Sequence, residues 1–294
     1  MSDPITVALY GGMGNQMFQY AMGRALSLRA GLPLCFDFYG FEFDAHYQRK
    51  FELDCFALSS FARARHPRLF RVARTLRRSA EIWPGISRLG GSRIVVEDSK
   101  VVNPGKLRAA GGSYVMGYWQ NENHFSDVSG VIRADFSLSK GFTEQNRKIA
   151  EEISRCPEAV AIHVRRLHGV PASAAATTTG KTTSVLSLQP DYYAAAVKML
   201  RSKLRSPEFF VFSDHPQWAR ESLSLDGHAH FLDNDRGPDR EDMLLMARCR
   251  HHVVANSSFS WWGAWLAGHD GQIVIAPKGA HKYLPDIPTN WFSV

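Results

Sequence analysis

Short apolar runs alternate with segments of helical periodicity through the second half of this chain. The apolar runs lie at residues 159–164, 209–212, 230–232, 253–255 and 272–276. Helical segments stand between them at 192–201, around Trp218 and Leu223, and at 241–247. This order is typical of β-α-β units, in which parallel strands form a sheet with helices on both faces. The pattern predicts an α/β fold.

The first half opens in the same way. Residues 5–9 predict a buried strand, a helical segment then ends near Gly31, and residues 34–38 predict a second strand. A charged helix at 143–154 is followed by Pro157, where we place a domain boundary. A chain of 294 residues suits two domains. We therefore expect two Rossmann-type parallel-sheet halves facing a cleft, at residues 1–157 and 158–294.

A glycine-rich loop, Gly11-Gly12-Met13-Gly14-Asn15-Gln16, follows the first predicted strand. Open α/β sheets bind ligands at this end of their strands. The loop lacks the Gly-Lys-Ser/Thr ending of a Walker A motif, and Met17 stands where a dinucleotide-binding loop has its third glycine. These features argue against a nucleotide triphosphatase and a nicotinamide-dependent dehydrogenase. Gly12 and Gly14 let the backbone approach a ligand closely, and Asn15 offers it an amide.

Residues 251–268 predict a strand, a polar turn and an aromatic helix that ends at Gly268. The turn consists of Asn256, Ser257 and Ser258. Such an elbow directs hydroxyl groups and the first backbone N–H groups of a helix toward one point, where a phosphate binds well. The alternative is an ordinary helix N-cap.

The strand predicted at 159–164 leads into His163-Val164-Arg165-Arg166. Charged groups at the end of a buried strand are costly unless an anion pairs with them. A diphosphate suits the arginines, because guanidinium groups bind phosphate oxygens bidentately. The alternative is a salt bridge to an acidic residue within the fold.

Residues 63–93 are rich in arginine, and the net charge of the chain is +7. Within 68–78, apolar residues share one face of a predicted helix while most arginines lie off it. This helix is either a solvated surface element or a peripheral contact with an anionic membrane that carries a lipid-linked acceptor. We do not expect nucleic-acid binding, because no recognised motif or interleaved aromatic residues accompany the arginines.

No secretory signal and no apolar stretch long enough for a membrane span are found in the sequence. We expect a cytoplasmic protein, with peripheral association at the inner membrane face as an alternative. The four cysteines, Cys35, Cys55, Cys156 and Cys249, are far apart and predict neither a zinc site nor disulfides. We expect them to be reduced and mostly buried.

Two polar segments carry weaker signals. Asp233-Asn234-Asp235 has the Asp-x-Asp form of some metal sites, yet the acidic, turn-rich run at 233–242 favours a surface loop. Residues 171–188 are mostly small and cannot form a core, so this segment is either a lid or disordered.

Taken together, these motifs resemble those of the bacterial α-1,2-fucosyltransferases of glycosyltransferase family 11. The resemblance spans nearly the whole chain and includes the loop at 11–21, Gly117-Tyr118-Trp119-Gln120, His163-Val164-Arg165-Arg166, Phe212-Ser213-Asp214, Asp242-Met243-Leu244-Leu245-Met246 and Asn256-Ser257-Ser258-Phe259-Ser260-Trp261-Trp262-Gly263. It implies a GT-B fold, GDP-β-L-fucose as donor substrate, no cofactor and no metal. It also implies inversion at the sugar carbon and an acceptor glycan with a terminal galactose.

The chemistry assigns roles to the motif residues. Negative charge develops on the departing diphosphate, so a fixed positive group must face it. We predict Arg165, His163 and Asn15 as catalytic residues. Donor-binding residues are expected at Gly12, Gly14, Arg166, Asp214, Asn256, Ser257, Ser258, Phe259 and Ser260. The second domain is expected to bind the donor and the first the acceptor.

Two positions depart from the family pattern. Where the family has His-x-Arg-Arg-Gly-Asp, this chain has Leu167 and His168, and where it has Ser-Asp-Asp, His215 replaces the second aspartate. His168 is a candidate general base or an exposed loop residue. The departures favour one alternative, a GDP-sugar-binding protein with weak or lost catalysis. A fucosyltransferase that forms another linkage is a second alternative, because related fucosyltransferases share the arginine motif. A basic surface-adhesion or nucleic-acid protein is a third, and it would bind polyanions in a salt-dependent way that GDP does not compete away.

Overall fold

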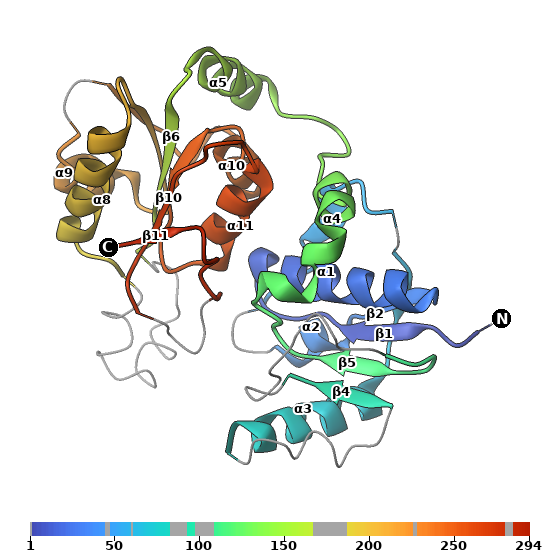
Figure 1. Ribbon diagram of the computed structural model, residues 1–294. Coiled ribbons are helices and arrows are strands. Elements are labelled where there is room, and N and C mark those ends of the chain that lie inside the picture. The colour runs from blue at the N-terminus through green and yellow to red at the C-terminus, as the bar shows by residue number, and fades with distance from the viewer. Residues whose placement is uncertain are drawn as a thin grey trace. The chain divides into compact units, whose positions relative to one another are not determined.

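The computed structural model describes residues 2–44, 48–59, 61–82, 93–97, 109–166, 187–225, 228–279 and 285–294. These residues form two compact units, Met1–Lys140 and Gly141–Val294 (Figure 1). The division falls between Lys140 and Gly141, whereas the sequence predicts it at residue 157. The reason is that helix α5 (Glu144–Arg155) packs against helix α10 (Asp239–Met246) of the second unit.

The first unit is built on a parallel sheet. Its described elements are β1 (Ile5–Ala8), α1 (Met13–Ala30), β2 (Leu34–Asp37), α2 (Tyr39–Phe43), η1 (Leu53–Cys55), β3 (Arg63–Ala64), α3 (Pro67–Ile82), β4 (Ile94–Val96), β5 (Tyr114–Met116), η4 (Glu122–His124), η5 (Ser126–Val128) and α4 (Ser129–Asp135). The strands have the order β3-β2-β1-β5-β4. In Figure 1, β1, β5 and β4 lie between α1 and α3.

Helix α1 lies close against the centre of this sheet. A Cβ atom at Gly23 would come within 2.7 Å of Val7 Cγ2, so the helix approaches β1 only because residue 23 is glycine. The helix ends at Gly31 with a φ of 65°, as the sequence predicts. This packing fixes the N-terminus of α1 beside the carboxyl end of β1.

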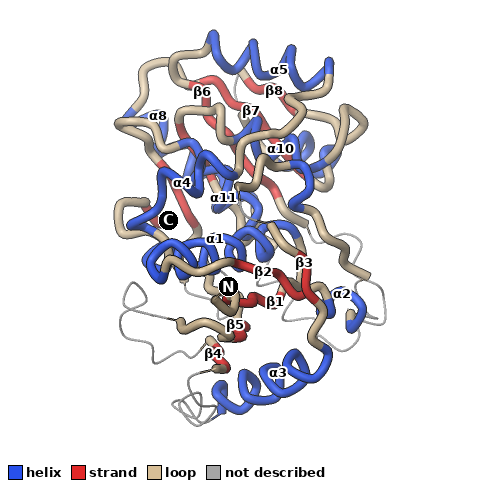
Figure 2. The backbone as a smooth tube through the Cα atoms, turned by 90° about the vertical axis from the view of Figure 1, so that its right-hand side faces the viewer, coloured by secondary structure: helices blue, strands red, loops and turns tan. Residues whose placement is uncertain are grey.

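The second unit also contains a parallel sheet, whose strands are shown in red in Figure 2. Its described elements are α5, β6 (Ala159–Val164), α8 (Pro190–Lys203), β7 (Glu208–Ser213), α9 (Pro216–Ser222), β8 (Ala229–Phe231), α10, β9 (His251–Val253), α11 (Ser258–Ala267), β10 (Val274–Ala276) and β11 (Phe292–Ser293). The strands have the order β11-β10-β9-β6-β7-β8. Read from the other edge, this is the 3-2-1-4-5-6 order of doubly wound nucleotide-binding sheets.

The two faces of β6 are packed differently, because successive side chains of a strand point to opposite faces. Val160, Ile162 and Val164 join a buried cluster with residues of α8 and α9. The intervening His163 instead contacts Phe259 of α11. The strand thus presents His163 to the part of the sheet where β9 leads into α11.

Candidate functional site

The candidate site of the second unit lies at the carboxyl ends of β6 and β9. The strand order reverses between these two strands, and doubly wound sheets bind ligands at that point. Ile162 of β6 pairs with Val253 of β9, and Val164 pairs with Ser213 of β7. One residue beyond the end of β6, Arg165 follows the same register opposite Asp214.

Arg165 forms an ion pair with this aspartate. Its Nη1 lies 3.2 Å from Asp214 Oδ2, and the two side chains are 34% and 16% exposed. The salt bridge that we considered as an alternative to a ligand is therefore present. The contact lacks hydrogen-bond geometry, since Oδ2 has no hydrogen-bond partner among the described residues. Asp214 neutralises the guanidinium without satisfying its own hydrogen-bonding capacity.

The neighbouring Arg166 has a different environment. Its backbone N–H donates to Asp214 Oδ1 over 2.8 Å, and its guanidinium carbon lies 4.1 Å from the centre of the Trp218 ring. Nη1 also donates to the Leu188 carbonyl at 3.4 Å. These contacts hold the side chain of Arg166 against α9 and the start of α8, so Arg165 is the better placed of the two for a ligand.

His163 is buried and neutral. Burial lowers its pKa to about 3, and the positive charge of Arg165 adds to this effect. Its ring centre lies 5.7 Å from that of Phe259, and its Nδ1 has no hydrogen-bond partner among the described residues. A neutral imidazole suits a hydrogen bond to an uncharged ligand group better than a contact with phosphate.

The three serines of the elbow between β9 and α11 differ in their hydrogen bonds. Ser257 is the N-cap, and its hydroxyl oxygen accepts the Phe259 N–H over 3.2 Å. Ser260 is buried, and its hydroxyl oxygen accepts the Ala255 N–H over 3.1 Å. Ser258 is partly exposed, and its hydroxyl and backbone N–H have no hydrogen bond in the described part of the chain. Of the elbow serines, Ser258 offers a ligand its donors.

A cavity of about 260 Å³ adjoins the elbow. Asn256 and Ser257 line it, together with Trp261 and the backbone around Asp286. Trp261 Nε1 donates to the Asp286 carbonyl at 3.0 Å and so fixes one wall. The cavity is largely apolar with polar groups at the elbow, as is usual where a ring system binds.

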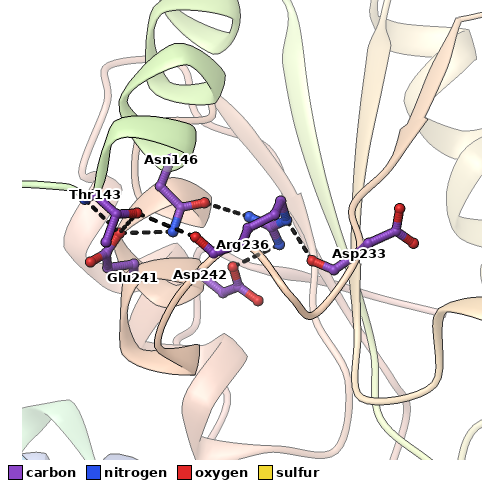
Figure 3. A network of polar contacts seen from close by, with 6 residues as sticks. All are labelled: Thr143, Asn146, Asp233, Arg236, Glu241 and Asp242. Atoms are coloured by element: carbon purple, nitrogen blue, oxygen red, sulfur yellow. Dashed lines mark hydrogen bonds and ion pairs between the residues drawn. The ribbon is translucent and has the colours of Figure 1, made fainter.

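A buried polar network anchors helix α10, which precedes the elbow (Figure 3). Glu241 Oε2 accepts hydrogen bonds from the Thr143 N–H, the Thr143 hydroxyl and Asn146 Nδ2. Arg236 donates to Asn146 Oδ1 and pairs with Asp242 at 2.9 Å. The network joins α5 to α10 and explains why α5 belongs to the second unit.

The replacement at His215 preserves a helix cap. His215 is the N-cap of α9, and its Nδ1 accepts the Trp218 N–H over 3.1 Å. An aspartate at this position has an acceptor for the same bond. The other departures, Leu167 and His168, lie outside the described residues, as does most of the segment 171–188.

The candidate residues of the first unit meet at the carboxyl ends of β1 and β5. Gly12 is the N-cap of α1 without a side-chain cap, and Gly11 has a φ of 79°. Asn15 follows in the first turn of the helix. Its Oδ1 accepts a hydrogen bond from Gln120 Nε2 over 2.7 Å, which leaves the amide Nδ2 for a ligand.

The loop after β5 holds Gln120 in place. Glu97 accepts the N–H groups of Tyr118 and Trp119 over 2.8 and 2.7 Å. Trp119 has a φ of 57°, and a Cβ atom at Gly117 would lie 2.4 Å from Glu97 Cβ. Glycine is therefore required at residue 117. The sequence pattern identified the motif but not the role of Glu97, which no motif marks.

Other predictions concern the surface and the cysteines. The helix predicted at 68–78 is present within α3. Asp233, Asn234 and Asp235 are exposed, and Asp233 pairs with Arg220. None of the four cysteines, all of which the structure describes, is in a disulfide; Cys55 and Cys249 are buried, and Cys35 and Cys156 are partly buried. Among the described helices, none is long and apolar enough to cross a membrane.

Comparison with known proteins defines first the fold class and then the family. A variant of the Arabidopsis thaliana fucosyltransferase FUT1 in complex with GDP has a similar fold, with a TM-score of 0.52 at 10% sequence identity over 93% of this chain and 70% of that chain. The chain thus has the α/β fold of two parallel-sheet halves known as GT-B.

Sequence similarity extends to the family. The sequence profile of glycosyl transferase family 11 matches residues 99–286. The alpha-1,2-colitosyltransferase of Escherichia coli is 31% identical over 278 residues, 93% of this chain and 91% of that protein. The galactoside alpha-(1,2)-fucosyltransferase 2 of Sus scrofa is 33% identical over 99 residues, 33% of this chain and 28% of the relative. The chain belongs to glycosyltransferase family 11 and is a glycosyltransferase.

Proposed function

We propose that this glycosyltransferase transfers L-fucose from GDP-β-L-fucose to a hydroxyl group of a galactoside, with inversion and without a metal, and that it forms an α-1,2 linkage. The observation that carries the proposal is the place of Arg165. Arg165 directly follows β6, and its guanidinium lies beside Asp214 after β7. On the other side of β6, β9 leads to Ser258, whose donors have no hydrogen bond among the described residues. Together these groups suit a diphosphate.

The reaction needs such a fixed charge. The bond between C1 of fucose and the diphosphate oxygen breaks, its electron pair leaves with GDP, and the acceptor oxygen bonds to the opposite face of C1. The acceptor hydroxyl loses its proton in the same step to a base, for which solvent water can serve, so the products are the fucoside, GDP and one proton. Arg165 would stabilise the negative charge that grows on the diphosphate, and Asp214 would keep the guanidinium in position until the donor binds. His163 would remain neutral and contact an uncharged part of the donor.

The relatives support the sugar and the linkage. One is named as a 1,2-colitosyltransferase and another as a galactoside 1,2-fucosyltransferase. Colitose is L-fucose without its 3-hydroxyl group, so the two donors differ by a single hydrogen-bonding group. The alternative of a sugar-nucleotide-binding protein without catalysis loses part of its support, because His215 keeps the helix cap that the replaced aspartate would make.

Calorimetric titration of the protein with GDP-fucose in EDTA tests whether the donor binds and whether its binding requires a metal. GDP-colitose, GDP-mannose and UDP-galactose are the comparisons, and radiolabelled transfer to β-galactosides follows. We expect GDP-fucose to bind without metal and fucose to appear on the 2-hydroxyl of galactose. Tighter binding and faster transfer of colitose would assign the other deoxy sugar. Binding without transfer to any β-galactoside would favour the non-catalytic alternative, and a lack of GDP-sugar binding would contradict the proposal.

A further inference from the structure

The first unit contains a cavity of about 630 Å³ at the carboxyl end of its sheet. Gly12 and Asn15 of the glycine-rich loop line one side, and arginines of α3 line another. The volume falls within the range of about 300–1,000 Å³ that is usual for small-molecule sites. Since Asn15 belongs to this cavity, a ligand bound here would reach the amide that we expect at the reacting centre.

Positive charge predominates in the cavity. Its charged lining residues are Arg49, Arg74, Arg77, Arg78 and one acidic residue, Asp44. Arg77 lies 3.5 Å from Glu97 and so has a carboxylate partner. The described lining of the cavity thus contains four guanidinium groups and one carboxylate.

Arg74 and Arg78 differ from Arg77, which pairs with Glu97. In the described part of the chain, neither has a carboxylate partner. Partial burial lowers the pKa of the Arg74 guanidinium, and the positive charge of Arg78 lowers it further. Arg74 is partly buried and Arg78 is exposed, and an anion bound between these two like charges would relieve their repulsion.

Aromatic rings accompany these arginines. The guanidinium carbon of Arg74 lies 4.4 Å from the centre of the Phe43 ring, and that of Arg77 lies 4.9 Å from the Tyr118 ring. Tyr10 and Tyr118 contact each other with ring centres 5.1 Å apart. Flat apolar faces beside fixed cations suit a ligand with both a ring skeleton and a negative charge.

We propose that this cavity binds the acceptor and that the acceptor is an anionic glycan, whose carboxylate or phosphate group binds Arg74 and Arg78 while its sugar rings lie against Tyr10 and Tyr118. The inference rests on the proposed transfer reaction, because it names the class of acceptor. It also assigns the arginines of α3 to acceptor binding instead of contact with a membrane surface.

Acceptor kinetics with saturating GDP-fucose test the inference. The acceptors are lactose, a disaccharide of galactose and glucuronic acid, and a galactosyl disaccharide with a reducing-end phosphate. We expect KM to be at least about tenfold lower for one or both anionic acceptors than for lactose, with a loss of this preference in high salt. The KM values for the glucuronic acid disaccharide and for the phosphorylated disaccharide show which anion is preferred.

Variants assign the effect to the cavity. Arg74→Gln and Arg78→Gln are expected to raise KM for the anionic acceptor toward that for lactose, with little change for lactose itself. Arg68→Gln is the matched control, because Arg68 is an exposed residue of the same helix that does not line the cavity. Equal KM values for neutral and anionic acceptors would overturn the inference. A rise in the KM for GDP-fucose alone, or a loss only of binding to anionic vesicles, would also overturn it.

A second measurement separates this inference from the proposed function. Calorimetry of the two anionic disaccharides with the protein, without any donor, requires no catalysis. Binding that Arg74→Gln weakens while no fucose transfer occurs would support the cavity and contradict the proposed reaction. Transfer to lactose without binding of either anionic disaccharide would support the reaction and contradict the cavity.

Discussion

Arg165 and Asp214 face each other across the ends of two neighbouring strands, with Nη1 and Oδ2 3.2 Å apart. The register of β6 and β7 sets this pairing, since Val164 and Ser213 are the last paired residues of the two strands. The pair is partly exposed, and such pairs contribute about 0–1 kcal/mol to stability. Its main effect is thus to hold a guanidinium in place at the carboxyl edge of the sheet.

Replacement of Arg165 by alanine is expected to abolish transfer while the fold is kept. The loss of one preorganised donor to the transition state lowers turnover by about a hundredfold or more. The stability should change by less than about 1 kcal/mol, because the lost pair is partly exposed. Initial rates with saturating substrates and urea unfolding check the two expectations.

Arg155→Ala provides the comparison for this variant. Arg155 lies at the end of α5, before the start of β6, whereas Arg165 follows the other end of that strand, and it forms an exposed pair with Glu151 at 3.9 Å. It should leave both rate and stability unchanged. An Arg165→Ala protein with near-normal turnover would remove Arg165 from the catalytic residues.

Glu241→Ala is expected to destabilise the second unit by about 3 kcal/mol. The carboxylate is buried and accepts three hydrogen bonds, so its removal leaves the donors of Thr143 and Asn146 without a partner. Urea unfolding measures the change. Glu144→Ala, which removes an exposed carboxylate on the same helix as Asn146, should change stability by no more than about 0.5 kcal/mol. Equal effects of the two variants would contradict the role of the network.

The stability of the second unit should fall as the pH falls below about 6.5. Burial lowers the pKa of His163 and of His252 to about 3 in the folded protein. A depressed pKa means that the unfolded chain binds the protons first, so the stability is present above the unfolded pKa and is lost toward the folded one. Each histidine should remove about 2 kcal/mol between pH 7 and pH 5.

His163→Leu isolates one of these two contributions. The variant should lose less stability than the parent protein between pH 7 and pH 5, by about 2 kcal/mol. Urea unfolding at several pH values measures the difference. Parallel pH dependences of the parent and the variant would show that His163 is not buried as a neutral group.

Regular alternation made the second unit predictable from the sequence. The strand at 159–164 is found at the expected residues, and the helix stop at Gly268 is found with a φ of 55°. The expected strand 253–255 instead begins earlier, at His251, since both histidines there are buried in the sheet. Periodicity marks such elements because each buries one regular face.

Fewer strands of the first unit were predicted, because β3, β4 and β5 are two or three residues long and, unlike the short strands of the second unit, do not fall in a regular alternation with predicted helices. β5 precedes Gly117 but is too short for a periodic signal. The sequence predicts the domain boundary later than it lies for another reason. The bonds that tie α5 to the second unit join Thr143 to Glu241, 98 residues apart, and no local pattern reports such a contact. For the candidate site, motif residues were identified, but their partners Glu97 and Trp218 were not.

Asn15 should act on the reaction directly, whereas Gln120 should act only through Asn15. Gln120 Nε2 donates to Asn15 Oδ1 over 2.7 Å and thereby fixes which amide group faces the cavity. Asn15→Ala should lower kcat by about a hundredfold, as expected for a lost transition-state donor. Gln120→Leu should lower kcat less, by about tenfold, since the amide of Asn15 remains but can rotate. In the double variant the Gln120 change should have no further effect, which steady-state kinetics of the four proteins would measure. Additive losses would mean that Gln120 acts independently of Asn15.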